Sequence, residues 1–377
     1  MKIKTKNAMI FLFILLLVPI EINMTIYHYS FYLKAIFSII YFVLFLVSKP
    51  TKKEFILMFI FLIFNISTCF SDIIDKTFTI RLFFSKVYPF GLYCGVMYCL
   101  KKDYEGFLYQ MRNVGIFVTF LFVIELIINI ITSKPLTPIL YFNRNGMQLY
   151  LLFIIGSVLL YNQVKNTKYK KIDIIVFIIS ISGLFISGSA TSAIIGLFII
   201  AFIFFNIKNI NILYYYIFYI IIWYFLIIGR NSDNFLLQFV FKTFKKNSTF
   251  SNRLWRWDYS LEFIKSSWLW GQTNLLDVVK DKNDFFINET FNAHNGILQV
   301  FVYSGIFGIT SMITLFLDFA KKVNRLIGTK FYKYIVTVVL SYLICSYTES
   351  ALSNNILVLY MFILVGIFYN KKEQIKE

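Results

Sequence analysis

Long runs of apolar residues, repeated along most of the chain, constrain the fold more than any other feature of this sequence. Runs of about 20 residues match the hydrocarbon thickness of a bilayer. They are too long and continuous for the alternating strands of a membrane β-barrel, so α-helices are expected to cross the lipid. Only 15% of the residues are charged, whereas soluble chains carry roughly 25%. We therefore predict an all-α, polytopic transmembrane bundle that forms a single integral membrane domain over residues 1–377.

The bundle is expected to contain about twelve spans, of which the first is short. They are expected near residues 8–20, 26–47, 54–70, 80–100, 114–131, 146–164, 172–188, 191–206, 212–229, 294–318, 332–347 and 352–370. The N-terminal Met1-Lys2-Ile3-Lys4 and the apolar run behind it imitate a signal peptide. Because that run lacks a small-residue cleavage site and many more spans follow, we interpret it as an uncleaved first helix.

The basic residues indicate how these spans are oriented. More than half of the 37 Lys and Arg residues fall near the two chain ends and in alternate connections, around residues 49–53, 101–112, 165–171 and 321–333 and at Lys208. The opposite short connections hold little basic charge beyond Lys76, Arg81, Lys134 and Arg144. The positive-inside rule therefore places both termini in the cytoplasm. The net charge of +18 follows from this orientation and does not indicate nucleic-acid binding.

Residues 231–293 are the one long break between apolar spans, and the orientation above makes them an extracytoplasmic loop. The loop contains four of the five Trp residues, namely Trp255, Trp257, Trp268 and Trp270. Ser251 or Asn252 can cap a helix here, and Gly271 would end it. Trp257, Leu261, Ile264 and Trp268 recur at spacings of four, three and four. This pattern predicts a short amphipathic helix on the membrane surface, with Trp at headgroup level.

Two arginines and a histidine in and beside this loop are the leading candidates for chemistry. Arg253 and Arg256 can point the same way from the predicted helix, and two guanidinium groups can hold a diphosphate. The alternative is snorkelling of Arg beside Trp. His294 is expected in the first turn of span ten after a capping Asn292. A helix N-terminus favours a neutral imidazole, which can accept a proton. The alternative for His294 is a polar marker of the membrane boundary.

Further polar residues are predicted on the same outer side. Arg144 and Asn145 open span six, and Arg81 lies near the outer end of span four. Glu349 precedes span twelve. Together these residues can line an outward-facing cleft that favours anions. Inside span five, Glu125 lies one helical turn from Asn129, and the two are a candidate buried polar pair.

Neither a disulfide nor a metal site is expected. Cys69, Cys94, Cys99 and Cys345 lie in or beside apolar spans and form no C-x-x-C pattern. We interpret them as packing residues. The two His residues are far apart in sequence, so we expect no metal and no cofactor.

Several motifs in the second half of the chain occur in a characteristic order. They are Asn143-Arg144-Asn145-Gly146, the turn Ser187-Gly188-Ser189, the segment from Ser251 to Trp257 continuing to Gly271, and His294-Asn295-Gly296 with Leu298, Gly305 and Gly308 behind it. In this order they resemble the O-antigen polymerase and O-antigen ligase superfamily of bacterial membrane glycosyltransferases. The resemblance runs across spans six to twelve; spans one to five match only as hydrophobic helices.

The resemblance implies transfer of a glycan from an undecaprenyl diphosphate carrier to an acceptor hydroxyl. The transfer would take place on the outer face of the bacterial cytoplasmic membrane, without metal. Arg253 would bind the diphosphate with help from Arg256, and His294 would activate the acceptor. Family members often carry Arg after the Ser-Gly-Ser turn, where this chain has Ala190. A second phosphate-binding Arg would then come from Arg144, Arg230 or Arg81, or that role is absent.

The resulting hypothesis is a polymerase of lipid-linked polysaccharide repeat units in O-antigen, capsule or exopolysaccharide synthesis. Its expected partners are the lipid-linked donor and acceptor, the bilayer and a chain-length regulator. An O-antigen ligase, which passes the glycan to lipid A-core or a protein, is the nearest alternative. A glycolipid flippase is more distant because it predicts short loops. An intramembrane serine protease is a poor match, since the chain has no G-x-S-G around Ser189.

Overall fold

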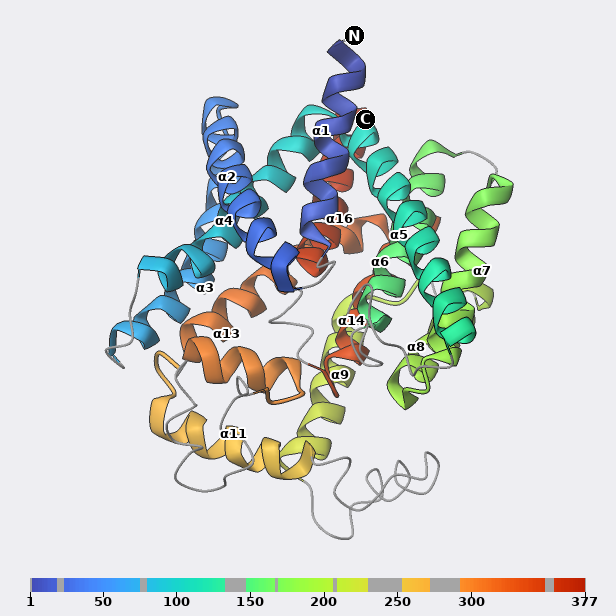
Figure 1. Ribbon diagram of the computed structural model, residues 1–377. Helices are drawn as coiled ribbons and strands as arrows, with labels where there is room; N and C mark the ends of the chain where they lie inside the picture. The colour runs from blue at the N-terminus through green and yellow to red at the C-terminus, as the bar shows by residue number, and fades with distance from the viewer. Residues whose placement is uncertain are drawn as a thin grey trace.

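The computed structural model is a bundle of α-helices (Figure 1). It describes residues 2–18, 24–74, 80–132, 147–166, 169–205, 209–229, 253–271, 292–349 and 356–376. The helices are α1 (Lys2–Leu17), α2 (Met24–Val47), α3 (Lys52–Ile74), α4 (Ile80–Lys102), α5 (Tyr104–Thr132), α6 (Met147–Lys165), α7 (Lys171–Ile186), α8 (Ala190–Phe204), α9 (Ile212–Ile227), α11 (Arg253–Ser267), α13 (Gly296–Val323), the 3₁₀ helix η2 (Asn324–Leu326), α14 (Lys330–Cys345) and α16 (Ile356–Lys376). Within these ranges there is no β-strand, and the all-α prediction is confirmed there.

The helices coincide with the predicted spans. Each of the twelve predicted ranges overlaps one helix, from α1 to α9 and then α13, α14 and α16. By length and composition, three described stretches are long and apolar enough to cross a membrane: Tyr104–Ile128, Met147–Lys165 and Gly296–Leu326. Shorter apolar stretches occur in α1, α2, α8, α9 and α16. Large apolar side chains such as Ile130 and Phe204 are exposed on the outside of the bundle, as expected of a surface that faces lipid.

The centre of the bundle contains α6 and α16, and nearly all of α6 is buried. A Cβ atom at Gly156 of α6 would lie 2.7 Å from the ring of Phe362 of α16. Small residues of this kind allow helices to approach closely where lipid offers no hydrophobic driving force between them. The four cysteines are buried among the helices, which agrees with their interpretation as packing residues.

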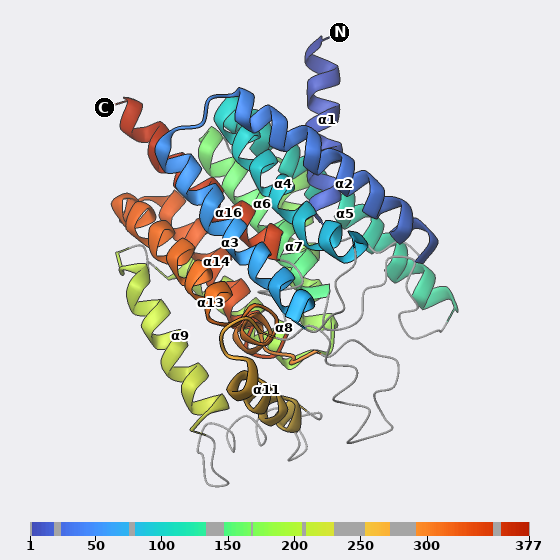
Figure 2. The same cartoon turned by 90° about the vertical axis from the view of Figure 1, so that its left-hand side faces the viewer.

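Hydrogen bonds between helix connections define one end of the bundle. Lys101 at the end of α4 donates to the carbonyl oxygen of Ser48 after α2, and Lys165 at the end of α6 pairs with Glu105 at the start of α5. Tyr332 at the start of α14 donates to a carbonyl ahead of α9. These connections are the ones rich in Lys and Arg. Figures 1 and 2 show both chain termini on the side of the bundle opposite α11.

Two glycines with left-handed backbone fix the end of α11 against α13. Gly271 follows α11 with φ of 78°, and Gly305 interrupts α13 with φ of 55° and ψ of −156°. A Cβ atom on either glycine would lie 2.6 Å or less from backbone atoms of the other segment. No side chain fits there, so both positions need glycine. The amide of Ile306 donates to the carbonyl oxygen of Trp268 at 2.9 Å. The segment after α11 therefore packs against the kink in α13. Gly271 follows α11, as predicted.

The buried face of α11 includes three residues of the predicted amphipathic face, Trp257, Leu261 and Ile264, but it packs on other helices of the protein. Trp257 is 1% exposed and packs in a small apolar cluster with Ile227 of α9 and Leu298 of α13. Trp268 was expected on the same face but is 55% exposed. The helix ends at Ser267, so helical spacing no longer sets the direction of Trp268. The buried side of α11 thus lies on the protein's own helices.

Candidate functional site

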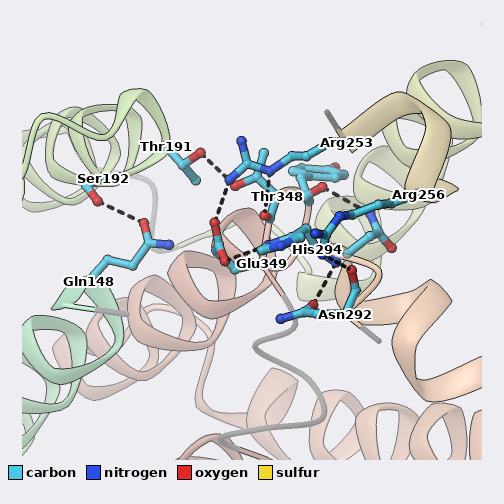
Figure 3. Close-up of polar contacts among 11 residues, drawn as sticks. Gln148, Thr191, Ser192, Arg253, Arg256, Asn292, His294, Thr348 and Glu349 are labelled. Atoms are coloured by element: carbon cyan, nitrogen blue, oxygen red, sulfur yellow. Dashed lines mark hydrogen bonds and ion pairs between the residues drawn. The ribbon is translucent and has the colours of Figure 1, made fainter. Parts of the chain in front are cut away.

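Three segments far apart in sequence meet at the end of the bundle that carries α11 (Figure 3). They are the first turn of α11, residues 292–296 at the start of α13, and the turn 346–349 after α14. The amide of Gly296 donates to the carbonyl oxygen of Ser346 at 2.7 Å. This bond joins the second and third segments, and Arg253 and Arg256 of α11 join the first segment to both.

Arg253 is held by the turn after α14. Its Nε donates to the carbonyl oxygen of Thr348 at 3.1 Å, and its Nη2 donates to Oε1 of Glu349 at 2.8 Å. The Arg253 and Glu349 side chains are 13% and 12% exposed, so the ion pair is largely shielded from water. Charge attraction is stronger in such a place than at an open surface. The guanidinium therefore has a set direction, and its planar donors suit carboxylate or phosphate oxygens.

His294 faces the other oxygen of the same carboxylate. Its Nδ1 lies 3.5 Å from Oε2 of Glu349, at the long limit of a hydrogen bond. A carboxylate that accepts from Nδ1–H leaves Nε2 as the ring nitrogen able to take a proton. The backbone of His294 is left-handed, with φ of 47°, a conformation that His adopts more readily than most residues. Its amide donates to Oδ1 of Asn292 at 2.8 Å, which supports this turn.

The start of α13 differs from the prediction in one respect. The N-cap is Asn295 and not Asn292: Oδ1 of Asn295 accepts from the amide of Leu298 at 3.0 Å, and its Nδ2 donates to the carbonyl oxygen of Tyr347 at 3.1 Å. The side chain of Asn292 bonds the amide of His294 instead, so the helix begins after His294. The histidine thus lies just before the N-terminus of α13 and not within its first turn.

Arg256 connects α11 to the segment that carries His294. Its Nη1 donates to the carbonyl oxygen of Asn292 at 3.0 Å. Its guanidinium carbon lies over the Trp255 ring, 5.3 Å from the ring centroid. Arg253 and Arg256 therefore extend toward opposite ends of one polar cluster, with His294 between their contacts (Figure 3).

The start of α8 borders the cluster. The hydroxyls of Thr191 and Thr348 lie 2.7 Å apart, and the hydroxyl of Ser192 donates to Oε1 of Gln148 at 2.9 Å. The start of α8, which follows the Ser187-Gly188-Ser189 turn, thus lies beside the turn that holds Arg253. Ala190 opens α8 and supplies no charge at the position where the resembled family often has Arg.

Several predicted site residues cannot be placed in this cluster. Arg144, Asn145 and Arg230 lie outside the described residues, and Arg81 belongs to α4 with its side chain not described. Their roles stay predictions. Glu125 of α5 is buried, and its carboxylate oxygens have no hydrogen-bond partner within the described part of the chain. The side chain of its predicted partner, at position 129, is not described.

The cluster combines the groups needed to move a group from an anionic carrier to a hydroxyl. A fixed guanidinium stabilises charge that develops on a leaving group. An imidazole paired with a carboxylate takes the proton of an attacking hydroxyl. The sequence predicted Arg253, His294 and Glu349 as site residues. It did not predict that the Glu349 carboxylate faces both Arg253 and His294. These pairs are separated by 96 and 55 positions, and no local pattern signals contacts over such distances.

The fold and the site define a helical, membrane-compatible protein with a polar, arginine-containing site at one end of the bundle. Comparison with known proteins agrees: the family model described as O-Antigen ligase matches residues 175–313. The match supports the resemblance of this chain to the O-antigen ligase and polymerase superfamily. It covers α8, α9, α11 and much of α13, and so includes Arg253 and His294 but not Glu349. No curated protein sequence matches the chain. The family consists of bacterial membrane proteins that are glycosyltransferase-like enzymes, ligases and polymerases.

Proposed function

We propose that this protein polymerises polysaccharide repeat units carried on undecaprenyl diphosphate. It transfers a growing glycan from its lipid diphosphate to a sugar hydroxyl of another lipid-linked repeat. The observation that carries the proposal is the meeting of Arg253 and His294 on the two oxygens of Glu349. An anion-binding group and a proton acceptor then lie on either side of one point, where a glycosyl donor and an acceptor hydroxyl can meet.

The transfer is a single displacement at the anomeric carbon. The acceptor oxygen forms a bond to that carbon, and the bond from the carbon to the diphosphate oxygen breaks with inversion. The acceptor proton passes to Nε2 of His294, and the electron pair of the broken bond stays on the diphosphate. Arg253, assisted by Arg256, stabilises the charge on the departing diphosphate. The diphosphate is already a good leaving group, so this reaction needs no metal in our proposal.

The membrane setting follows from the lipid carrier. We propose that all twelve helices other than α11 cross the cytoplasmic membrane of a bacterium, with both termini in the cytoplasm. The Lys- and Arg-rich connections support this orientation. So does the position of α11 opposite the termini (Figure 2). The site then opens at the outer face, and the apolar bundle offers the polyprenyl tail a surface in the lipid.

Other residues complete the proposed substrate site. Arg144, Asn145, Arg81 and Arg230 are proposed to contact the diphosphate or the sugars, and one of these arginines would replace the cation missing at Ala190. The proposed partners are the lipid-linked donor and acceptor, the bilayer and a chain-length regulator.

An O-antigen ligase is the second candidate, favoured by the description of the matching family model. It uses the same displacement but passes the finished glycan to a different acceptor, lipid A-core or a protein. The two activities differ only in the acceptor hydroxyl, so the arrangement of Arg253 and His294 suits both. The acceptor must therefore be tested directly.

Purified protein in lipid nanodiscs, supplied with one lipid-linked repeat as its only substrate, separates these candidates. A polymerase should form a ladder of longer lipid-linked chains and release one polyprenyl diphosphate for each bond. His294→Ala should slow this transfer by about 10²–10⁴-fold because the general base is lost, while donor binding persists.

Product that forms only after lipid A-core is added would identify a ligase. A wild-type protein that binds the donor but transfers to neither acceptor would overturn the glycosyltransferase proposal. A normal chain ladder from His294→Ala would overturn the role of the histidine.

A further inference from the structure

The Glu349 side chain lies between Arg253 and His294, the two groups that the proposed reaction needs. Its Oε1 accepts from Arg253 at 2.8 Å, and its Oε2 lies 3.5 Å from Nδ1 of His294. Figure 3 shows dashed lines from this carboxylate to both side chains. The sequence suggests that Glu349 binds substrate, but both of its oxygens are directed at protein groups.

The turn that carries Glu349 is fixed from several sides. The Glu349 amide donates to the carbonyl oxygen of Cys345 at 3.1 Å. The Thr348 carbonyl accepts from Arg253, and the Thr348 hydroxyl contacts Thr191 of α8. The Ser346 carbonyl oxygen accepts from the amide of Gly296, the first residue of α13. Because α8, α11, α13 and α14 all contribute, the carboxylate has a set position relative to His294.

A carboxylate in this position acts on the histidine in two ways. It accepts from Nδ1–H and so leaves Nε2 to face the acceptor hydroxyl. When Nε2 takes the proton, the ring becomes positively charged, and the adjacent carboxylate stabilises that charge. The other oxygen of the same carboxylate pairs with Arg253. A donor diphosphate that engages Arg253 therefore draws the guanidinium away from Glu349 and leaves the carboxylate to His294.

We propose that Glu349 is a positioning residue that orients His294 and links it to the diphosphate site at Arg253. This inference rests on the proposed glycosyl transfer. In it, donor binding completes the base: before the donor arrives, the carboxylate is shared between the Arg253 guanidinium and the neutral His294 imidazole, and afterwards it serves the histidine alone. The proton path stays the same, from the acceptor hydroxyl to Nε2.

Kinetics of Glu349→Gln and Glu349→Asp in nanodiscs test this link. Glu349→Gln keeps the size of the side chain but removes its charge, so kcat should fall roughly tenfold to a hundredfold. KM for the lipid-linked donor should stay the same or fall, because Arg253 no longer has a competing carboxylate. Glu349→Asp, which keeps the charge on a shorter arm, should give an intermediate kcat. Glu105→Gln, which breaks an ion pair at the opposite end, is the matched control and should behave as wild type.

A double-mutant cycle with His294→Ala decides whether Glu349 acts through the histidine. Once His294 is absent, Glu349→Gln should cause no further loss of kcat. An equal loss in both backgrounds, a normal kcat, or a raised donor KM with unchanged kcat would overturn the inference. Should Glu349→Gln not fold, the Glu349→Asp cycle answers the same question. A fully active His294→Ala would overturn the role of the histidine and with it this inference. A wild-type protein that transfers glycan to neither acceptor would instead count against the proposed function, so the two failures are distinguishable.

Discussion

Two arginine–carboxylate pairs lie at opposite ends of the bundle, and they differ in how completely protein groups surround them. We call the fully buried pair closed and the partly exposed pair open. At the end near the termini, Nε of Arg112 donates to Oδ1 of Asp173 at 2.6 Å, and the Asp173 side chain is 0% exposed. Asn162 and the amide of Lys170 donate to the other carboxylate oxygen. At the α11 end, Arg253 pairs with Glu349, both side chains keep some exposure, and His294 lies beside them, 26% exposed.

The two pairs differ in the groups that surround the carboxylate. Asp173 has neutral donors on its second oxygen, and Arg112 also lies 5.4 Å from the ring centroid of Tyr161. Such a closed pair joins α5, α6 and α7 and leaves no place for a ligand. The second oxygen of Glu349 faces His294, which gains charge in the proposed reaction. We infer that the closed pair stabilises the fold and that the open pair serves catalysis.

Removal of Arg112 should have the largest effect of the substitutions in the two pairs, and the quantity affected should be the free energy of unfolding. Arg112→Ala leaves the buried Asp173 charge without its cation, which costs about 3–5 kcal/mol in comparable pairs. Thermal unfolding in nanodiscs, followed by Trp fluorescence, should show a clearly lower midpoint. Arg112→Ala combined with Asp173→Asn should recover part of the loss, because Asn keeps a polar oxygen for the amide of Lys170. An unchanged midpoint for Arg112→Ala would show that the closed pair is not a stabilising contact.

Removal of Arg253 should have a smaller effect, and it should fall on activity. Arg253→Ala should slow transfer roughly tenfold to a hundredfold, which is about 1.5–3 kcal/mol for a charge-assisted contact to the leaving group. Arg253→Lys should be less impaired than Ala but slower than wild type, because a lysine lacks the planar fork. The unfolding midpoint should fall less than in Arg112→Ala, since Glu349 keeps some exposure to water and Asp173 keeps none. If Arg253→Lys matched wild type in rate and donor KM, the fork would not bind the diphosphate.

Chelation should have the smallest effect of all. The proposed chemistry at the open pair uses an arginine and a histidine, so transfer by the purified protein should continue at its normal rate in excess EDTA. Assays with and without added Mg²⁺ or Mn²⁺ make the measurement. Activity that EDTA abolishes and a divalent ion restores would indicate a carboxylate site in the loop, and Asp277, Asp281 and Asp284 would be the first residues to substitute.

Much of the fold could be predicted from the sequence because membrane helices are specified locally. A run of apolar residues has one stable conformation in lipid, and each of the twelve predicted ranges overlaps a helix. The α11 helix and the glycine after it were likewise predictable from spacing. The surface against which α11 packs was not, because the partners of Trp257 lie on α9 and α13.

The sequence predicted which residues form the candidate site better than it predicted the contacts between them. Arg253 and His294 stand out because they flank the one long loop, and Glu349 stands out as an acid before a span. Asn292 was wrongly expected to cap α13, since two Asn residues lie close together there and either one satisfies the pattern. Asn295 takes that role because it also reaches the carbonyl of Tyr347.

The sequence by itself determined the helical class, the positions of the helices and which end of them is basic. Those properties depend on hydrophobicity and charge within single segments. The tertiary structure alone decided that Glu349 lies between Arg253 and His294. It also decided that the Arg112–Asp173 pair is fully buried while the Arg253–Glu349 pair keeps some exposure. Such contacts depend on how distant helices pack: the left-handed glycines 271 and 305 seat α11 on α13, and a hydrogen bond from Gly296 to Ser346 brings the turn after α14 alongside.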